Sequence, residues 1–446
     1  MRGPVTRFLA LFFLFGACGD NLTSPFADPP SIAVVSMPVS GGNVLDILFV
    51  IDDSPGVAHI QNSLAEGADA LLQPLDAVTD GRLDLHLGTT TSDFGTTALR
   101  DSSHPGPAIG QIGNGGCAGA GKDGALVLSS APVVGSYLID GPTTNYMGSR
   151  HDVLGQMFKV GSGGCGFEQP LAASVRAFAN PANVGFRRDG GNLLVIFIQD
   201  EDDCTLLDTQ LLGPSSEELG PLQSFRCTRF GVQCDEDLSS VGPKHNCGPR
   251  HDSPFVLDVD ALPDEYRSLV TDPARLVVGV VAGPTEPVGV ELILPPGGIP
   301  PLQEQLVHAC AWIRQDGDLA VADPPVRMQS VVEMLGAHGS LTSVCSADLR
   351  PSLTELARVA KQMFGVACLD TSKLRDSDTA AGVQPTCTAT LVAGSVEEPL
   401  PACPTDGACF QIVSDAAACA ETGDHLRFVV HDAPVDAYIR ARCEVP

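Results

Sequence analysis

Apolar residues follow two alternating patterns along the chain. Nearly continuous apolar runs at 45–52, 193–198 and 275–283 are typical of strands that are covered on both faces, and DLHLGTTTS at 84–92 is predicted to be a further strand. Between the first run and the run at 84–92, a helical spacing is carried by Val57, Ile60, Leu64, Ala68, Leu71, Leu72 and Leu75. The alternation of strand and helix predicts an α/β fold with a doubly wound, mostly parallel sheet of the Rossmann-like type.

Three later segments are predicted to be helices from the spacing of their apolar residues. They are EQPLAASVRAFANP (168–181), LQEQLVHACAWI (302–313) and RPSLTELARVAKQMFG (350–365). Asn180-Pro181 ends the first of these segments, because a proline cannot continue a helix.

Composition divides the chain into a leader, a main domain and a small C-terminal domain. The predicted parts are a signal peptide at 1–17, a tether rich in Pro, Ser, Gly and Asp at 18–43, a main α/β domain at 44–368 and a disulfide-rich β domain at 369–446. Two cysteine-bearing stretches inside the main domain, 95–166 and 201–254, are expected to be long insertions.

The N-terminal residues have the pattern of a secretory signal. Arg2 and Arg7 accompany an apolar run at 8–15, which is too short to span a membrane as a mature helix. Cys18 follows two small residues and resembles the cysteine of a bacterial lipobox, which becomes lipidated. We therefore expect an exported lipoprotein of the cell envelope, at the outer membrane or facing the periplasm, that contacts the membrane through its lipid anchor only.

The cysteine count supports the same compartment. The chain has 15 cysteines, so 14 remain for pairing if Cys18 carries a lipid. An even number of cysteines in an exported chain predicts a disulfide framework, here of up to seven bridges. Zinc binding is the alternative, but no pair of C-x-x-C knuckles is present in the sequence.

The net charge narrows the range of partners. It is −28, from 54 acidic and 26 basic residues. A negative field of this size repels phosphate backbones and anionic lipid surfaces, so nucleic acid is excluded as a partner. The acidic residues are compatible with bound cations or with simple solubility outside the cell.

Two of the most apolar predicted strands end in acidic residues. Asp52 and Ser54 come at the end of the first strand, and the acidic run at 200–203 follows the strand at 193–198. In an open parallel sheet, ligands bind in the loops beyond the carboxyl ends of the strands. Hard oxygen ligands that converge there favour Mg²⁺ or Ca²⁺.

These residues resemble the metal-ion-dependent adhesion site of the von Willebrand factor type A domain. That family carries Asp-x-Ser-x-Ser after its first strand, a Thr on a later loop and an Asp after a central strand. FVIDDSPG matches the opening at Asp52 and Ser54, and VIFIQDEDD matches the later Asp at Asp200. The resemblance covers about residues 45–366 and extends to divergent bacterial surface lipoproteins with such domains. It implies a Mg²⁺ or Ca²⁺ ion at Asp52, Ser54 and Asp200 that keeps one position for a partner's carboxylate.

The motif departs from the family pattern at two places. Gly56 stands where the second serine belongs, so one hydroxyl ligand is absent. The loop at 163–168 contains no threonine, and Ser162 or Glu168 could substitute for it. Asp202 is a further, secondary ligand candidate. Because Mg²⁺ requires near-octahedral geometry, the missing ligands are expected to lower its affinity.

Both acidic motifs also have an interpretation without metal. Asp53 or Ser54 could cap the helix that follows the first strand and interact favourably with its dipole. The acids that follow Asp200 could belong to a solvated loop and be exposed.

The sequence favours a binding protein over an enzyme. It contains no G-x-S-x-G elbow and no Walker-type or dinucleotide-binding glycine loop. We predict a non-catalytic adhesion protein of the cell envelope that binds a protein or polysaccharide at the cell surface. Two alternatives stay open: an envelope scaffold that has lost the metal, and a secreted hydrolase whose site is not recognised.

Overall fold

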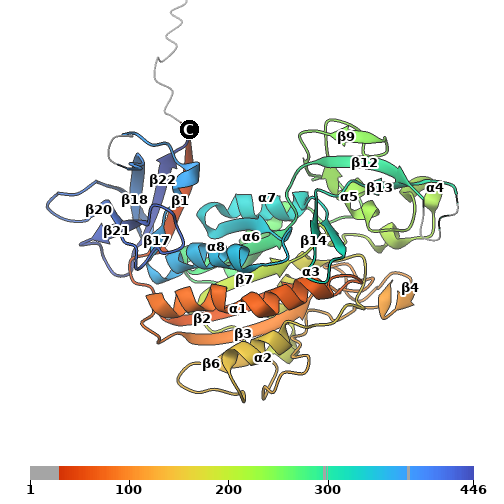
Figure 1. The fold of residues 1–446 in the computed structure, drawn as a ribbon, viewed down its shortest axis with the longest axis horizontal. Coiled ribbons are helices and arrows are strands. Elements are labelled where there is room, and N and C mark those ends of the chain that lie inside the picture. The colour runs from red at the N-terminus through yellow and green to blue at the C-terminus, as the bar shows by residue number, and fades with distance from the viewer. Residues whose placement is uncertain (1–29, 295–297, 299, 379–381) are drawn as a thin grey trace, which may run out of the picture.

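The computed structural model describes residues 30–294, 298, 300–378 and 382–446, and a six-stranded sheet lies at its centre (Figure 1). The predicted signal peptide, the lipidation site at Cys18 and the first part of the predicted tether lie outside the described residues.

The central sheet has the strand order β16-β11-β7-β2-β3-β6. Its strands are β2 (Val44–Ile51), β3 (Asp84–Thr91), β6 (Leu138–Asp140), β7 (Asn192–Ile198), β11 (Leu276–Ala282) and β16 (Gly339–Ser343). All neighbours in this sheet are parallel except β6, which pairs antiparallel with β3. The mostly parallel α/β sheet is therefore confirmed, and the four predicted strands correspond to β2, β3, β7 and β11.

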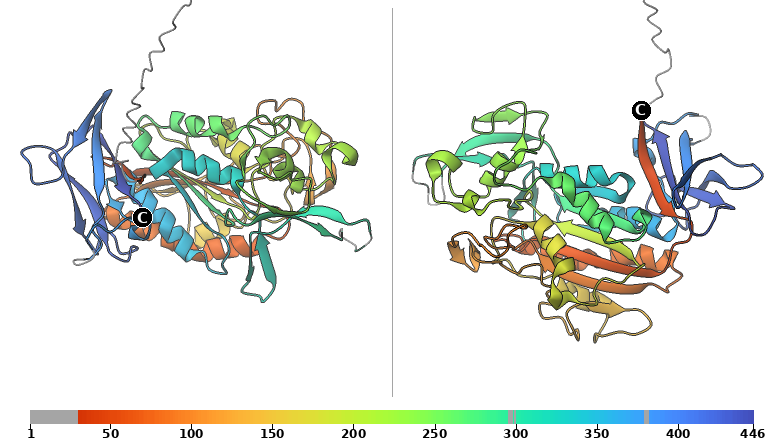
Figure 2. Two further views of the ribbon diagram at one scale, coloured as in Figure 1. Left: turned by 90° about the horizontal axis from the view of Figure 1, so that it is seen from above. Right: turned by 180° about the vertical axis from the view of Figure 1, so that it is seen from behind.

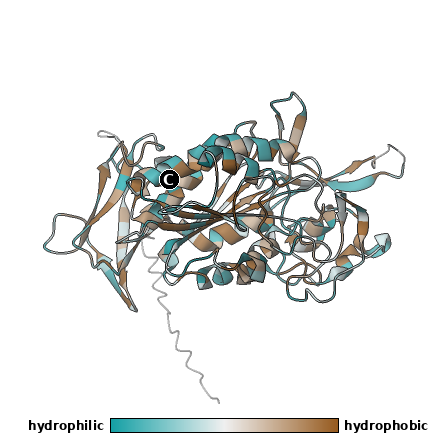
Figure 3. Ribbon diagram, turned by 90° about the horizontal axis from the view of Figure 1, so that it is seen from below, coloured by the Kyte–Doolittle hydropathy of each residue, from teal (hydrophilic) through white to brown (hydrophobic). Residues whose placement is uncertain are grey.

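Helices cover both faces of the sheet (Figures 1 and 2). One core contains residues of α1 (Ala58–Val78), α2 (Arg150–Met157) and α8 (Arg350–Ala360), and the other contains residues of α3 (Pro170–Ala179), α6 (Leu262–Ser268) and α7 (Val326–Leu335). Successive side chains of a strand point to opposite faces, so Phe49 belongs to the first core and Leu48 to the second. Hydrophobic residues accordingly gather along the central strands (Figure 3).

The order of the strands reverses at β2, which lies between β3 and β7. From β2 the chain moves to β3 on one side, and it later returns to β7 on the other side of β2. Loops diverge at such a reversal, and open α/β sheets bind their ligands there. Ile51 pairs with Ile198, and the Asp52 N–H donates to the Ile198 carbonyl at 3.0 Å. The two acidic motifs therefore meet at this reversal.

The predicted insertions contain short elements of their own. The first holds β4 (Ile109–Ile112), β5 (Asn114–Cys117), α2 and the edge strand β6, and the second holds α4 (Ser216–Leu219), α5 (Phe225–Gly231), β8 (Val232–Gln233), β9 (Gly242–Lys244) and β10 (Gly248–Pro249). β9 pairs with β12 (Val288–Ile293), which pairs with β13 (Gln303–Leu306). Part of the first insertion is thus an integral edge of the central sheet.

The helix predicted at 302–313 is wrong. These residues form β13 and β14 (Cys310–Ile313), and β14 makes a hairpin with β15 (Leu319–Ala322). Trp312 is buried while Ala311 and Ile313 are exposed, which is the two-residue alternation of a strand. Short apolar runs fit either element, and here the pairing with β15 decides the conformation.

The prediction of a tether at 18–43 is also wrong for its second part. Residues 31–38 form β1 (Ser31–Pro38), which pairs antiparallel with the C-terminal strand β22 (Tyr438–Glu444). The C-terminal region has two sheets, one with the order β1-β22-β18-β19 and one with the order β17-β21-β20. Their other strands are β17 (Ala367–Cys368), β18 (Cys387–Ala393), β19 (Val396–Leu400), β20 (Cys409–Ser414) and β21 (Leu426–His431). Val35 and Met37 lie in the core of this region. The small β region therefore includes a strand from before the main domain.

Every cysteine in the described residues is in a disulfide, which confirms the predicted framework of seven bridges. The pairs are Cys117–Cys165, Cys204–Cys227, Cys234–Cys247, Cys310–Cys345, Cys368–Cys419, Cys387–Cys443 and Cys403–Cys409. No helix within the described ranges is long and apolar enough to cross a membrane.

Candidate metal centre at the carboxyl edge of the sheet

Asp52 is the residue directly after β2, and its side chain is buried. Its Oδ1 accepts hydrogen bonds from the Ser54 backbone N–H at 2.7 Å and from the Ser92 hydroxyl at 3.5 Å. Its Oδ2 is buried and has no hydrogen-bond partner among the described residues. A buried carboxylate oxygen without a partner is costly unless a cation or a proton satisfies it.

Asp200, two residues after the end of β7, lies beside Asp52. The two carboxyl groups are within hydrogen-bonding reach of each other. The Asp200 Oδ1 is also buried without a partner within the described part of the chain. Burial raises the pKa of both groups, and the neighbouring Asp52 charge helps to hold the pKa of Asp200 well above its usual value. The fold therefore brings Asp52 and Asp200 together at one point.

Glu168 approaches the same point from the loop before α3. Its side chain is buried, and the Cys204 N–H donates to its carbonyl at 2.8 Å. The Cys117–Cys165 disulfide holds this loop against β5. Ser162 is exposed. Asp52, Asp200, Glu201 and Glu168 form what we call the acidic cluster. Of the two residues that could replace the missing threonine, Glu168 is thus the one that lies in this cluster.

Glu201 is a member of the cluster that the sequence analysis left out. Its carboxyl group is within hydrogen-bonding reach of Glu168 and of the Ser224 hydroxyl. Burial raises the pKa of Glu201 to about 8, and the Asp323 charge adds to this effect. Asp323 itself pairs with His308, whose Nδ1 lies 2.6 Å from Asp323 Oδ1.

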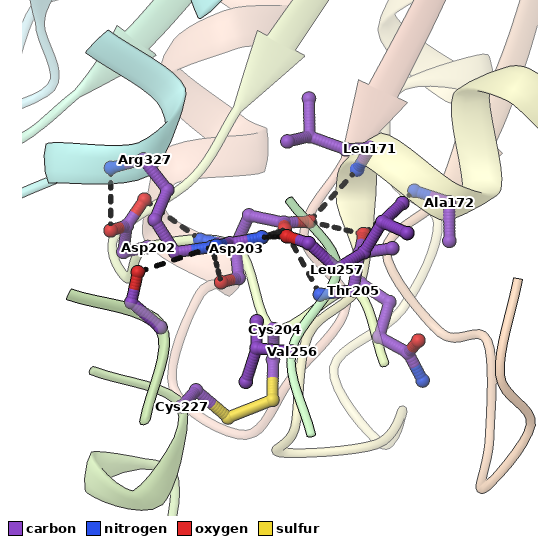
Figure 4. A network of polar contacts seen from close by, with 12 residues as sticks. Leu171, Ala172, Asp202, Asp203, Cys204, Thr205, Cys227, Val256, Leu257 and Arg327 are labelled. Atoms are coloured by element: carbon purple, nitrogen blue, oxygen red, sulfur yellow. Dashed lines mark hydrogen bonds and ion pairs between the residues drawn. A yellow bond between two sulfur atoms is a disulfide. The ribbon is translucent and has the colours of Figure 1, made fainter. Parts of the chain in front are cut away.

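Asp202 and Asp203 are buried, so the interpretation of this run as an exposed loop is wrong (Figure 4). The Asp202 carboxylate accepts from the backbone N–H groups of Arg327 at 2.9 Å and Met328 at 3.2 Å, which caps α7. Asp203 accepts from the Leu171 N–H of α3 at 3.1 Å. Both oxygens of Asp202 are therefore used by the protein, which removes Asp202 from the ligand set.

Asp53 is neutralised inside the protein by Lys122. The two form an ion pair in which the Asp53 side chain is 1% exposed. Burial raises the pKa of Asp53 to about 6, while the Lys122 charge acts in the opposite direction. α1 begins after Val57 without a side-chain cap, so neither Asp53 nor Ser54 caps this helix.

The carboxylates of the cluster form two close pairs, Asp52 with Asp200 and Glu168 with Glu201. Among the described residues, no three carboxylates of this cluster have oxygens that all lie within 4.8 Å of one another. Within the described ranges, the group of three that meets this distance is elsewhere, at His251, Asp258 and Asp260. A cation at the Asp52 pair would therefore complete its coordination with hydroxyl, backbone or water oxygens.

The donor set at this pair fits a hard divalent cation. Asp52 Oδ2 and Asp200 Oδ1 are partnerless carboxylate oxygens, and the hydroxyl-bearing residues Ser54 and Ser92 adjoin Asp52. Oxygen ligands of this kind suit Mg²⁺ and Ca²⁺ rather than the softer metals. Ser92, which follows β3, was not foreseen, although the polar residues TTTS at the end of that strand were a usable signal.

We compared the chain with known protein families, sequences and structures. Neither a protein family nor a curated protein sequence matches the chain. Partly similar solved structures include the open conformation of the pilus adhesin SpaC from Lactobacillus rhamnosus GG (9% identity, 91% of this chain and 39% of that chain, TM-score 0.31). Others are the pilus adhesin RrgA from Streptococcus pneumoniae (9%, 92% and 57%, 0.29) and a von Willebrand factor type A protein from Catenulispora acidiphila (10%, 93% and 62%, 0.27). The chain spans less than two thirds of each of these proteins.

Proposed function

We propose that this chain is a non-catalytic binding protein of the cell envelope that holds a Mg²⁺ or Ca²⁺ ion with Asp52, Ser54 and Asp200. A protein or polysaccharide at the cell surface is the proposed partner, engaged at the carboxyl edge of the sheet. The observation that carries this proposal is the meeting of Asp52 and Asp200 at the strand reversal, each with a buried oxygen that has no partner among the described residues. A divalent cation would supply the positive charge that these oxygens lack.

A hairpin with an exposed apolar residue adjoins the β2–α1 loop. Gly115 of β5 lies against Pro55, such that a Cβ on Gly115 would be 3.2 Å from the proline ring. Ile112, on the same β4–β5 hairpin, is 62% exposed. Exposed apolar side chains beside a ligand-binding loop are typical of interaction surfaces.

A second apolar hairpin, β14–β15, contacts the start of α1. The rings of Trp312 and His59 have centroids 5.6 Å apart. Ile313 and Leu319 are cross-strand partners on this hairpin and are 61% and 65% exposed. Together with the β4–β5 hairpin, these residues offer a partner apolar contacts close to the proposed cation.

The seven disulfides support an exported location, because such bridges form and persist in oxidising compartments. A lipid anchor at Cys18 is part of the proposal. Cys18→Ser is expected to move the protein from the membrane fraction to the soluble fraction, and continued membrane association would overturn the anchor.

A metal-free envelope scaffold is the second candidate function. It is favoured by the missing hydroxyl at Gly56 and by the pairwise arrangement of the carboxylates, which leaves few protein ligands for one ion. In this case Asp52 and Asp200 would share a proton instead of a cation.

Calorimetric titration with Mg²⁺, Ca²⁺ and Mn²⁺ of the chain without residues 1–17 separates the two functions. We expect binding that is lost in Asp52→Ala and in Asp200→Ala. Asp258→Asn, in the acidic group at His251, is the control and is expected to keep this binding. No binding at millimolar metal, or binding that both alanine variants retain, would overturn the cation site and leave the scaffold.

The partner is tested by retention of the protein on immobilised cell-wall polysaccharide and on surface protein extracts, with Ca²⁺ and with EDTA. Ile313→Asp is expected to weaken retention without changing cation binding, because it places a charge on the apolar hairpin. Retention that is indifferent both to EDTA and to this substitution would contradict binding at this edge.

A further inference from the structure

His59 lies in the first turn of α1 and touches two different segments. Its Nδ1 is 2.9 Å from the carbonyl oxygen of Gly56 in the β2–α1 loop. Its ring lies against Trp312 of β14, with the ring centroids 5.6 Å apart. A carbonyl oxygen only accepts hydrogen bonds, so Nδ1 carries the proton and donates it to Gly56. His59 therefore connects this loop to the β14–β15 hairpin.

The other ring nitrogen of His59 is enclosed. His59 Nε2 is buried and has no hydrogen-bond partner among the described residues, and the same is true of Trp312 Nε1. In the neutral ring Nε2 is an acceptor and the indole N–H is a donor, so the two groups are complementary. Protonation of His59 turns Nε2 into a donor and adds a positive charge, and a buried donor without an acceptor is unfavourable. The contact between the rings therefore suits the neutral form of His59.

The charged groups that act on His59 belong to the hairpin. Burial lowers the pKa of His59 and outweighs the opposing hydrogen bond to Gly56. The Arg314 charge lowers this pKa further and the Asp316 charge raises it, but the two form an ion pair at 3.0 Å and largely offset each other. A cation–π attraction would favour protonation only if His59 lay over the face of the Trp312 ring, and the two rings are tilted by 47°.

The hairpin is fixed at its base, whereas its tip makes mostly exposed contacts (Figures 1 and 2). At the base, the Cys310–Cys345 disulfide links β14 to the loop before α8. Near the tip, Gln315 Nε2 donates to the Glu66 carboxylate of α1 at 3.1 Å and to the Ala347 carbonyl at 3.3 Å, and both bonds are exposed. Trp312 supplies the buried contact on this side of the hairpin. The tip can therefore move while the base stays covalently attached.

We propose that His59 and Trp312 form a pH-controlled latch, which holds the β14–β15 hairpin against α1 while His59 is neutral and releases the hairpin tip when His59 is protonated. Ile313 and Leu319, which are 61% and 65% exposed, move with the tip. The latch needs no bound cation and so goes beyond the proposed function. Only its effect on a partner rests on that function.

The latch is expected to weaken as the pH falls below about 6.5, the pKa of an unperturbed histidine. Because the closed form has the lower pKa, the open form binds more protons at acid pH and becomes more populated. Each unit by which the pKa of His59 is lowered corresponds to about a tenfold shift toward the open form between neutral and acid pH. Protons on the acidic cluster stabilise the folded chain instead, so the two effects have opposite signs.

Trp312 is the single tryptophan of the chain, so its fluorescence reports on the latch. The chain without residues 1–17 is titrated in EDTA from about pH 8 to about pH 5, across the range in which histidine ionises, with acrylamide as a quencher. We expect emission at longer wavelength and stronger quenching at acid pH, because the indole meets water. His59→Gln cannot become charged and is expected to abolish both changes. His151→Gln, from an exposed pair with Asp69, is the control and should keep them.

Two results would overturn the latch. One is emission and quenching that stay constant across this range, or that change in His59→Gln as they do in the unchanged protein. The other comes from an NMR titration of the His59 ring in the unchanged protein, which does not depend on the folding of a variant. The measured pKa is expected to be lower than about 6.5, and a value at or above this number would show that the ring contact does not disfavour the charged form.

Retention on surface protein extracts at both ends of the titration separates the latch from the proposed function. The unchanged protein is expected to lose retention at acid pH, and His59→Gln is expected to lose less of it. An equal loss in both proteins would overturn a role of the latch in partner binding. If the fluorescence shows opening but neither protein is retained at any pH, the proposed partner is contradicted and the latch stands.

Discussion

Asp203 and Arg327 form an ion pair in which both side chains are fully buried. Arg327 Nη2 lies 3.1 Å from Asp203 Oδ2, and neither side chain has exposed surface. The guanidinium also donates to the carbonyls of Asp203 and Leu257, at 2.9 Å and 2.8 Å. Figure 4 shows that the pair joins the segment after β7 to the first turn of α7. The two residues therefore fix the position of the acidic run relative to that helix.

Removing one partner of this pair is expected to be costly. Arg327→Met leaves Asp203 buried without its counter-charge and should lower the free energy of unfolding by about 3–5 kcal/mol. Asp203→Asn is expected to cost less, because an amide still offers an acceptor to the Leu171 N–H. Urea unfolding measures both. Arg250→Met, from an exposed pair with Asp252, is the control, with an expected change of about 0.5 kcal/mol or less. Equal effects of Arg250→Met and Arg327→Met would contradict this account.

The acidic cluster makes the metal-free protein less stable as the pH rises. The pKa of Glu201 is about 8 in the folded protein against 4.5 for an unperturbed glutamate, and the pKa values of Asp52, Glu168 and Asp200 are also raised by burial. Between these values the folded state binds more protons than the unfolded state, so folding stability falls with increasing pH. In EDTA the thermal midpoint is expected to drop by about 3 °C or more between pH 6.5 and pH 8.

Two comparisons check the origin of this pH dependence. Glu201→Gln should make this pH dependence shallower, because one of the titrating groups is gone. Saturating Ca²⁺ should reverse it, because cation binding requires deprotonated carboxylates and strengthens as the pH rises. A midpoint that increases with pH in EDTA would show that the cluster does not dominate the titration in this range.

Met37 tests whether β1 belongs to the C-terminal region. It is 3% exposed and packs in the core that contains β18 and β22. Met37→Ala is expected to destabilise this region by about 2–4 kcal/mol, because it leaves a cavity. Ile32→Ala, at a position that is 38% exposed, is the control and should cost less than about 1 kcal/mol. Hydrogen exchange of the β18 and β22 amides measures the effect, and unchanged protection would refute the assignment.

Trp312 reports on the hairpin beside the proposed cation site. It is the single tryptophan of the chain and is 8% exposed. The Cys310–Cys345 disulfide links its strand to the loop before α8. Replacing both cysteines by serine is expected to shift the fluorescence emission to longer wavelength, because the hairpin loosens and the indole meets water. Replacing Cys403 and Cys409 by serine should leave the emission unchanged, and an equal shift in both variants would indicate general unfolding.

The parallel strands were predictable because they are apolar on both faces. β2, β7 and β11 are fully or almost fully buried, and continuous apolar runs of this length are typical of strands inside a parallel sheet. The β13 and β14 strands were not predictable, since their apolar residues also fit a helical spacing and the choice depends on pairing with β12 and β15. β1 was missed because its partner, β22, lies at the other end of the chain.

Part of the site could be predicted because two of its residues closely follow strands that are recognisable in the sequence. Asp52 and Asp200 follow buried strands, so their positions are set by the sheet itself. The burial of Asp203 and the raised pKa of Glu201 depend instead on distant groups, namely Arg327 for Asp203 and Asp323 for Glu201. A run of four acids is usually solvated, and nothing local in the sequence reveals the side chains that cover this one.

The place of β1 has a mechanical consequence. The Val445 N–H donates to the Pro30 carbonyl at 2.9 Å, so any segment before Pro30 leaves from the C-terminal sheet. β1 also contacts the turns that precede β11 and β16, at the amino ends of the parallel strands and thus at the edge opposite to Asp52. If the chain is held before Pro30 while a partner pulls at Asp52, tension runs through the short backbone path of β1 and β2. The remaining strands of the central sheet and the disulfide-linked insertions lie outside this backbone path, whereas the pairing of β1 with β22 lies on it.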